Sequence, residues 1–323
     1  MFRTEIKLPV STLQITHKTN IVTAGSCFSN VIGTLLRDNK FPTTINPFGI
    51  IYNPVSLFRL LNQATLNQSP TEDLLLERDG IWYHFDLHSE IWESSKEALV
   101  KRISSITQMA SNTIQNADLV TITPGTSFVY ELTGQEHIVA NCHKLPAKNF
   151  NKKLLDPSAI LSAFDQFYSN LKKINPKVKT LFTISPVRHI KDTMELNSVS
   201  KSILRYAIYE ITKSYSDVYY FPSYEIMMDD LRDYRFYKED MIHPDPVAEK
   251  YIWEKFKETY MSEKTRKLIK DWEKVVRAIH HKPFHPDSVA HKKFLNETLQ
   301  KIKGFKQEFD VSEELETIRK KIS

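Results

Sequence analysis

The sequence predicts an α/β fold in which a mainly parallel central sheet is covered by helices on both faces. Between residues 20 and 256, short apolar runs typical of buried strands alternate with segments in which apolar residues recur at helical spacing. Strands that alternate with helices in this way are typical of parallel sheets. The chain has 323 residues, of which 41% are hydrophobic and 11% aromatic, so it can build a sizeable core.

The first strand and helix meet at a short turn within residues 20–40. The apolar run from Ile21 to Ala24 predicts a buried strand, which Gly25 ends. After Ser26 and Cys27, apolar residues return at helical spacing, at Phe28, Val31, Ile32, Leu35 and Leu36. The pattern therefore predicts a strand, a tight turn that carries a hydroxyl group, and a helix.

The elements that follow continue the alternation. We expect strands at residues 43–45, 82–87, 118–123, 178–184 and 218–221, and helices at 54–61, 94–116, 156–174, 197–215 and 246–256. Residues 126–143 are expected to form a hairpin around Thr133-Gly134, and residues 224–235 a helix that becomes irregular. Asn197 or Ser198 is the expected cap of the helix at 197–215.

The composition changes at residue 262. The segment from there to residue 323 contains no convincing strand and many Lys and Glu residues. Two or three helices are expected in it, at 263–281, 286–303 and 311–322. We therefore expect a domain at residues 1–261 and a helical extension at 262–323, packed on the domain or on a partner.

Charge and composition exclude several classes of protein. The net charge is +5, and Lys and Arg are interleaved with Asp and Glu, so no nucleic-acid partner is expected. No apolar run is long enough to span a bilayer, and the first ten residues lack an apolar signal-peptide core. The two cysteines, Cys27 and Cys142, form no disulfide framework. The sequence thus predicts a cytoplasmic protein with no membrane partner.

Several polar residues lie in loops that follow predicted strands, where open α/β sheets bind ligands. Asn46 and Gly49 follow the strand at 43–45, His189 follows the strand at 178–184, and Asn141 and His143 end the hairpin. Each can contact a substrate, although Asn and Gly are also ordinary turn residues.

No metal or cofactor is predicted. His84 and His88 share one face of a strand, but no carboxylate or thiol accompanies them at ligand spacing. Asn141, Cys142 and His143 offer one thiol and one imidazole, which is too few ligands for zinc. The histidines near the C-terminus, at positions 280, 281, 285 and 291, are best interpreted as a solvated connection between helices.

Ser26 is the candidate nucleophile. A serine at a helix N-terminus faces free backbone N–H groups that favour developing negative charge, although it can also simply cap the helix. Of the 11 histidines, His243 is the best candidate base, because Asp240 precedes it by three residues in the same loop and can reach its Nδ1 atom. Cys27 is a rival nucleophile, but we expect its side chain to point away from that of Ser26 into the packing.

Five motifs of this chain resemble those of the GSCFA-domain family, which belongs with the SGNH (GDSL-like) hydrolases. They are AGSCFS at 24–29, NPFGIIYNP at 46–54, VANCHKLPAK at 139–148, TISPVRHIKD at 183–192 and DMIHP at 240–244. The resemblance covers residues 1–260 approximately, with Ser29 where the family name has Ala. It implies the three-layer, flavodoxin-like fold of SGNH hydrolases.

The resemblance also implies roles for individual residues. Ser26 would be the nucleophile, His243 the base and Asp240 its partner, with the backbone N–H groups of Ser26 and Gly49 as oxyanion donors. The third block of SGNH enzymes is typically GxND, and the matching stretch here begins at Gly125 and has Ser127 where the asparagine is expected. The Ser127 hydroxyl could substitute for that donor, or Asn46 or Asn141 could reach in.

These residues point to acyl transfer. The preferred hypothesis is a serine esterase that hydrolyses small O-acyl esters through an acyl-enzyme on Ser26. Its partner would be a small acylated substrate, and the resemblance to related esterases suggests an O-acetyl carbohydrate. One alternative is a non-catalytic binding or scaffold protein on the same fold, because the expected asparagine is missing. Another is an acyltransferase that passes the acyl group to a different acceptor.

Overall fold

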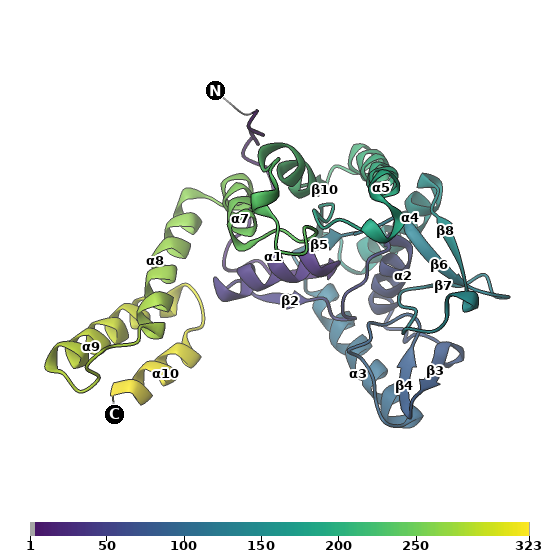
Figure 1. Ribbon diagram of the computed structural model, residues 1–323. Helices are drawn as coiled ribbons and strands as arrows, with labels where there is room; N and C mark the ends of the chain where they lie inside the picture. The colour runs from purple at the N-terminus through teal and green to yellow at the C-terminus, as the bar shows by residue number, and fades with distance from the viewer. Residues whose placement is uncertain (1–3, 323) are drawn as a thin grey trace. The chain divides into compact units, whose positions relative to one another are not determined.

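The computed structural model of the chain describes residues 4–322 (Figure 1). These residues form two compact units. The first contains residues 4–7, 20–34 and 43–254, and the second contains residues 8–19, 35–42 and the chain from 255 onward. The second unit therefore includes two early segments that the expected boundary at residue 261 assigns to the first.

The first unit is built on a five-stranded parallel sheet, as the sequence predicts. Its strands are β1 (Ile21–Gly25), β2 (Thr43–Ile45), β5 (Leu119–Thr123), β9 (Lys179–Phe182) and β10 (Val218–Tyr220), in the order β10-β9-β5-β1-β2. This is the flavodoxin-like order, in which the direction of winding reverses between β1 and β5. Ligands bind in such sheets beyond the carboxyl ends of the strands at the reversal, and Ser26 and Gly125 lie near that point.

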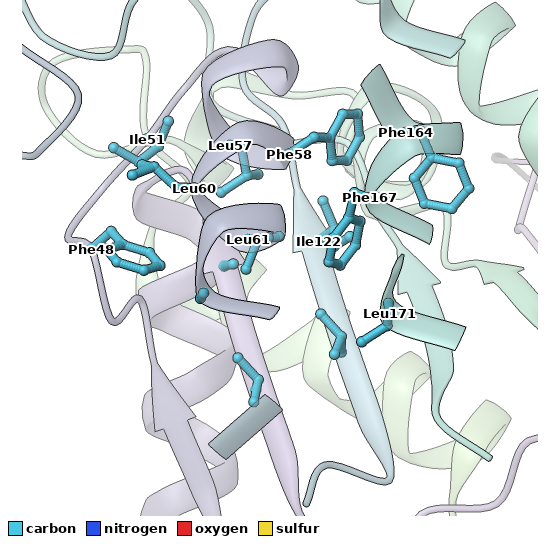
Figure 2. Close-up of a cluster of buried hydrophobic side chains, with 14 of the residues drawn as sticks. Phe48, Ile51, Leu57, Phe58, Leu60, Leu61, Ile122, Phe164, Phe167 and Leu171 are labelled. Carbon is cyan, nitrogen blue, oxygen red and sulfur yellow. The ribbon is translucent and has the colours of Figure 1, made fainter. Parts of the chain in front are cut away.

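Helices cover both faces of this sheet. On one face, α2 (Pro54–Thr65), α3 (Lys96–Gln115), α4 (Pro157–Ile174) and α5 (Met194–Ser214) share a core with alternate residues of the strands. Figure 2 shows part of this core, where Leu57, Phe58 and Leu61 of α2 and Phe164, Phe167 and Leu171 of α4 lie close to Ile122 of β5.

Helix α1 (Cys27–Asp38) covers the opposite face. A Cβ atom at Gly33 would lie 2.9 Å from side-chain atoms of both Thr23 and Ile45, so only glycine lets the helix approach β1 and β2 this closely. Thr23 of β1 thus faces α1, whereas Val22 and Ala24 of β1 belong to the core beneath α2, α3, α4 and α5. This alternation is expected of a sheet that helices cover on both faces.

Two small antiparallel sheets accompany the central one. Strands β3 (Leu75–Arg78) and β4 (Ile81–His84) form a hairpin, of which β4 overlaps the predicted strand at 82–87. Both turn residues, Asp79 (φ 55°) and Gly80 (φ 75°), have the positive φ of a type I′ turn. The predicted hairpin at 126–143 is formed by β6 (Phe128–Leu132) and β7 (Ile138–Val139). A further strand, β8 (Phe150–Leu154), pairs with β6 and was not expected.

The chain between β10 and the C-terminal helices is less regular. It contains α6 (Ser223–Glu225), a π-helical turn (Ile226–Asp230), a 3₁₀ turn (Tyr234–Phe236) and α7 (Pro246–Tyr260). The segment at 224–235, predicted to be a helix that becomes irregular, is helical up to Asp230 and irregular after it.

Three helices follow in the second unit, as predicted: α8 (Glu263–His280), α9 (Val289–Gly304) and α10 (Ser312–Ile322). They have a core of their own, formed by Trp272, Val275, Ile279, Leu295, Ile302, Val311, Leu315 and Ile318. The indole N–H of Trp272 also donates to the Asp38 carbonyl oxygen at 3.1 Å, within the same unit.

No helix within residues 4–322 has both the length and the apolar character that crossing a membrane requires.

Candidate active site

The turn between β1 and α1 is fixed by backbone geometry. Gly25 has φ 140°, and a Cβ atom there would lie 2.3 Å from the Thr123 carbonyl oxygen, so no other residue fits without a shift of β5. The Gly25 N–H donates to Asn46 Oδ1 at 2.8 Å, and the Ile51 N–H donates to the Gly25 carbonyl oxygen at 2.9 Å. The loop after β2 therefore binds both the N–H and the carbonyl group of Gly25, the residue that precedes Ser26.

Asn46 acts within this turn and does not face the pocket described below. Its Oδ1 accepts from Gly25, and its Nδ2 donates to Asn30 Oδ1 at 2.6 Å. Its backbone N–H donates to the Thr23 carbonyl oxygen at 2.8 Å. Both polar atoms of the side chain are therefore used to brace the turn.

Ser26 is 1% exposed, and its hydroxyl oxygen is buried without a hydrogen-bond partner among residues 4–322. Its backbone N–H donates to the Thr123 carbonyl oxygen at 2.9 Å. The Gly49 N–H donates to the Asn46 carbonyl oxygen at 2.8 Å, because Gly49 closes a tight turn at φ 76°. The two backbone donors that the resemblance implies for an oxyanion are thus both engaged within the chain.

Asp240 and His243 form the pair that the sequence predicts. They lie in a hairpin-like loop that an antiparallel bridge between Tyr237 and Pro244 closes. Asp240 Oδ1 accepts the backbone N–H groups of Ile242 (2.9 Å) and His243 (3.0 Å), and its Oδ2 lies 2.7 Å from His243 Nδ1. These three hydrogen bonds lower the pKa of Asp240 to about 2. A carboxylate in this place makes Nδ1 the protonated ring nitrogen and leaves Nε2 to accept a proton.

His243 lines a pocket of about 450 Å³. The walls are formed by Thr126, residues 128–130, 139–142, 187–192 and 242–243, with Cys27, Tyr52 and Asn53. Cys27 thus lines the pocket, contrary to the expectation that its side chain is buried in the packing. It is the first residue of α1, and side chains of a helix lean toward the N-terminus, which here is the pocket end. Burial raises the pKa of its thiol, which disfavours the reactive thiolate.

Gly125 joins this pocket to Ser26. A Cβ atom at Gly125 would lie 3.0 Å from His189 Nε2, 3.2 Å from Tyr52 Cδ1 and 3.4 Å from Ser26 Cβ. His189 and Tyr52 line the pocket, and their rings meet edge to face at a centroid distance of 5.4 Å. His189 Nε2 is buried without a hydrogen-bond partner in the described part of the chain. Burial, and then the neighbouring Lys201 and His243, lower the pKa of His189 to about 3.

Of the other predicted residues, Asn141 lines the pocket, and its Oδ1 accepts the backbone N–H of His143 at 2.8 Å. Ser127 does not line it: its hydroxyl donates to the Ser200 carbonyl oxygen at 3.0 Å, and its N–H donates to Ser200 Oγ at 2.8 Å. Ser127 therefore anchors α5.

His143 also lies outside the walls of this pocket. Its ring nitrogens contact the His84 carbonyl oxygen at 2.8 Å and Ser89 Oγ at 3.2 Å. Burial lowers the pKa of this 2% exposed imidazole to about 4. It is a neutral histidine with both nitrogens satisfied, which fits a structural role.

Lys201 is a site residue that the sequence reasoning missed. It is 1% exposed, and its Nζ donates to the carbonyl oxygens of Gly125 and Ser185, both at 2.6 Å. It thereby connects the ends of β5 and β9 next to Ser26. Burial lowers its pKa to about 7. Its spacing with the buried Leu204 and Ile208 places it on the apolar face of α5, which is the signal that could have identified it.

Helix α5 begins at Met194, and its N-cap is Thr193, so the expectation that Asn197 or Ser198 caps it is wrong. Asn197 lies in the first turn instead, and its Oδ1 accepts the His189 N–H at 2.9 Å. The polar loop between β9 and α5 is therefore tied to the helix through this hydrogen bond.

Arg188 connects the loop after β9 to the His243 loop. Its backbone N–H donates to the Ile242 carbonyl oxygen at 3.3 Å, and its guanidinium donates to the Met241 carbonyl oxygen at 3.4 Å. The guanidinium also lies 4.1 Å from the centre of the Tyr237 ring. Arg188 is therefore a structural contact of the His243 loop.

Comparison with protein families identifies the family of the chain. Residues 20–256 match the GSCFA family, and residues 272–323 match the C-terminal domain of GSCFA domain proteins. The chain belongs to the GSCFA family. No curated protein matches this GSCFA chain. Within residues 4–322, it has no group of three or more His, Cys, Asp or Glu side chains arranged to hold a metal ion.

Among solved structures, the GSCFA chain is similar to an acetyl xylan esterase, Est2A, from the rumen bacterium Butyrivibrio proteoclasticus. The TM-score is 0.30 and the sequence identity 10%. The similarity covers 76% of this chain and 64% of the esterase, which is less than two thirds of that protein.

Proposed function

We propose that this GSCFA protein is an SGNH-type serine esterase that hydrolyses small O-acyl esters. The observation that carries the proposal is the Asp240–His243 pair. The 2.7 Å contact between Asp240 Oδ2 and His243 Nδ1, with Oδ1 fixed by two backbone N–H groups, orients an imidazole in the wall of the pocket. Ser26 is not part of this wall, but it lies beside Gly125, as do His189 and Tyr52 of the wall. A base oriented by a carboxylate, together with a serine at a strand end, supports acyl transfer.

In the proposed reaction, His243 Nε2 takes the proton of Ser26 as its Oγ attacks the acyl carbon of the ester. The C–O bond to the alcohol then breaks, and the alcohol leaves with that proton. Water then attacks the acyl carbon while His243 takes one of its protons. The bond to Ser26 Oγ breaks, the acid leaves, and Ser26 takes the proton back from His243. Ser26 Oγ has no partner in the described residues, so the attacking geometry forms only when the ester binds, by rotation of the Ser26 side chain or movement of the His243 loop.

The pocket bears on the substrate class. About 450 Å³ accommodates a small acyl group together with part of its alcohol, and the wall combines apolar side chains such as Val187 and Ile242 with polar ones such as Asn141. We propose O-acetyl carbohydrates as the first substrates to screen. We also propose a cytoplasmic location, since neither cysteine of the chain forms a disulfide.

A non-catalytic binding protein is the second candidate. The observation that favours it is the state of Ser26, whose hydroxyl is buried while its N–H and that of Gly49 are both used within the chain. An acyltransferase would share the acyl-enzyme and differ only in the group that accepts the acyl unit.

Labelling with a fluorophosphonate tests the proposal. We expect the wild-type protein and the His285→Ala control, which removes an exposed histidine, to be labelled. We expect Ser26→Ala and His243→Ala to lose the label, and Cys27→Ala to keep it. The Cys27 variant separates the two adjacent nucleophiles. Folded wild-type protein that takes up no label contradicts the esterase and favours the binding protein.

Hydrolysis of 4-nitrophenyl acetate provides the second measurement. We expect Ser26→Ala to lower kcat by about 10³-fold or more, because the covalent route is removed. Adding sugar acceptors during turnover and analysing the products separates hydrolysis from acyl transfer to another alcohol.

A further inference from the structure

The proposed esterase lacks an evident donor for the oxyanion. Attack on an ester places negative charge on its carbonyl oxygen, which needs donors about 2.7–3.1 Å away. The N–H groups of Ser26 and Gly49 already donate to Thr123 and Asn46, and the Ser127 hydroxyl donates to Ser200. These two N–H groups and this hydroxyl are therefore occupied, and so are both polar atoms of Asn46, which leaves Asn141 as the remaining donor that the resemblance offers.

His189 has the complementary property, a polar atom without a partner. Its Nε2 is buried and makes no hydrogen bond within residues 4–322. A buried polar atom without a hydrogen bond destabilises the folded protein, and a ligand that bonds to it would remove this cost. The surroundings of Gly125 show that Ser26 lies near this atom. The three atoms closest to a Cβ at Gly125 belong to His189, Tyr52 and Ser26. Asn141 also lines the pocket but is not among them.

The surroundings of His189 fix its position. Its backbone N–H donates to Asn197 Oδ1 at 2.9 Å, and its ring meets the edge of Tyr52. Lys201 Nζ donates to the Gly125 carbonyl oxygen at 2.6 Å. This hydrogen bond fixes Gly125, which lies beside both His189 and Ser26. A donor held before the substrate arrives needs no rearrangement when charge develops, which is what makes such donors effective.

The surroundings also fix the charge of the ring. Burial and the nearby Lys201 lower the pKa of His189 to about 3, so the imidazole is neutral at every pH at which an esterase works. A neutral imidazole in the Nε2–H tautomer is a hydrogen-bond donor and can polarise a carbonyl group. No carboxylate bonds to His189 in the described part of the chain, whereas His243 has Asp240, so the role of base falls to His243.

We infer that His189 is a catalytic residue, which donates its Nε2–H to the carbonyl oxygen of the ester that Ser26 attacks. Lys201 and Asn197 are positioning residues for it. The inference rests on the proposed esterase function and names the donor that takes the place of the missing asparagine.

Two substitutions of His189 test this role with 4-nitrophenyl acetate as substrate. In His189→Leu the donor is lost, and we expect kcat to fall by about 10²–10³-fold while KM changes by less than about threefold. In His189→Gln the side-chain amide can donate from a position close to that of Nε2, and we expect it to recover kcat to within roughly tenfold of wild type. His285→Leu is the matched control and keeps wild-type kcat.

The pH profile separates a donor from a base. Because His189 stays neutral, we expect the acid limb of kcat/KM to have the same midpoint in wild type and His189→Gln. A His189→Gln variant as inactive as His189→Leu, while both unfold in urea like the wild type, overturns the donor role, since a base or a packing role is not replaced by an amide. His189→Leu with kcat within about threefold of wild type overturns it too.

The two proposals fail in different ways. If the wild-type protein neither hydrolyses the ester nor takes up fluorophosphonate, the esterase is wrong and the role of His189 falls with it. If Ser26 is labelled and the ester is hydrolysed, but His189→Leu retains full activity, the esterase stands and only the role of His189 is overturned.

Discussion

The side-chain carbonyl oxygen of Asn46 accepts the backbone N–H of Gly25 at 2.8 Å, one residue before Ser26. The amide nitrogen of the same side chain donates to Asn30 Oδ1 in the first turns of α1. A single buried asparagine on the loop after β2 therefore holds both ends of the turn that presents Ser26. The motif around Asn46 matters for the geometry of the nucleophile even though its side chain does not reach the pocket.

We expect Asn46→Ala to lower the free energy of unfolding by about 1–3 kcal/mol, because the Gly25 N–H is left buried without a partner. We also expect slower fluorophosphonate labelling of Ser26, by roughly tenfold, since the turn loses a constraint. Urea denaturation and labelling kinetics measure the two effects. Asn112→Ala, an exposed substitution on α3, should change the free energy of unfolding by less than about 0.5 kcal/mol. Equal losses in both variants would show that Asn46 has no special role.

Gly25 and Gly80 form a matched pair for the second prediction. Both have positive φ, but a Cβ at Gly25 would meet the Thr123 carbonyl oxygen at 2.3 Å, whereas one at Gly80 would meet nothing within 4 Å. We therefore expect Gly25→Ala to cost about 3 kcal/mol or more and Gly80→Ala about 1 kcal/mol. Thermal and urea unfolding of the two variants provide the comparison. Similar costs would mean that the contact with β5 relaxes.

The third prediction concerns Asp240→Asn. Asparagine keeps the Oδ1 acceptor for the N–H groups of Ile242 and His243, so the loop should keep its conformation. The charge that orients the His243 ring is lost, and we expect kcat for 4-nitrophenyl acetate to fall by about 10²–10⁴-fold with little change in KM.

The low pKa of Asp240, about 2, keeps its carboxylate charged at all working pH values, so Asp240 should not set the acid limb of the wild-type profile. Asp245→Asn is the control for this variant, because Asp245 caps α7 through the Ala248 N–H at 2.8 Å and does not contact the pair. It should retain kcat within about threefold. A wild-type rate in Asp240→Asn would remove His243 from the proposed mechanism.

Local features of this chain were predictable from sequence. The strand, turn and helix around Gly25 follow from apolar spacing over a few residues, and the Asp240–His243 contact joins residues in one short loop. In each case the interacting groups are close in sequence, so residue type and spacing determine the geometry. The order of the sheet strands followed from the resemblance, because it depends on contacts between residues about a hundred positions apart.

The errors concern contacts between distant elements. Ser127 was expected at the site because of its place in a motif, but Ser200 of α5 binds it. Lys201 was missed because nothing near it in sequence indicates that its ammonium group reaches two strand ends. Cys27 was assigned to the packing because the direction of the first residue of α1 depends on what surrounds the helix end.

Lys201 gives the last prediction, which concerns stability against pH. Its pKa is about 7 in the folded protein, whereas an unfolded chain has a lysine pKa of about 10.4. Below pH 7 both states bind the proton, and this group adds no pH dependence. Between pH 7 and 10 the unfolded state binds more protons than the folded state, so Lys201 makes the free energy of unfolding rise with pH. A neutral amine still has two N–H groups, which is enough for the carbonyl oxygens of Gly125 and Ser185.

Lys201→Met removes this titration, and its free energy of unfolding should lack the corresponding rise. The difference between wild type and Lys201→Met should therefore grow in favour of wild type by about 2 kcal/mol from pH 7 to pH 9, measured by urea denaturation. The two unpaired carbonyl oxygens in the variant shift its stability by a constant amount and do not affect this slope. Lys177→Met, which removes an exposed lysine, should follow the wild-type curve. Parallel curves for wild type and Lys201→Met would show that Lys201 stays protonated in the folded protein. Its positive charge would then favour the neutral form of His189 over the whole pH range of the measurement.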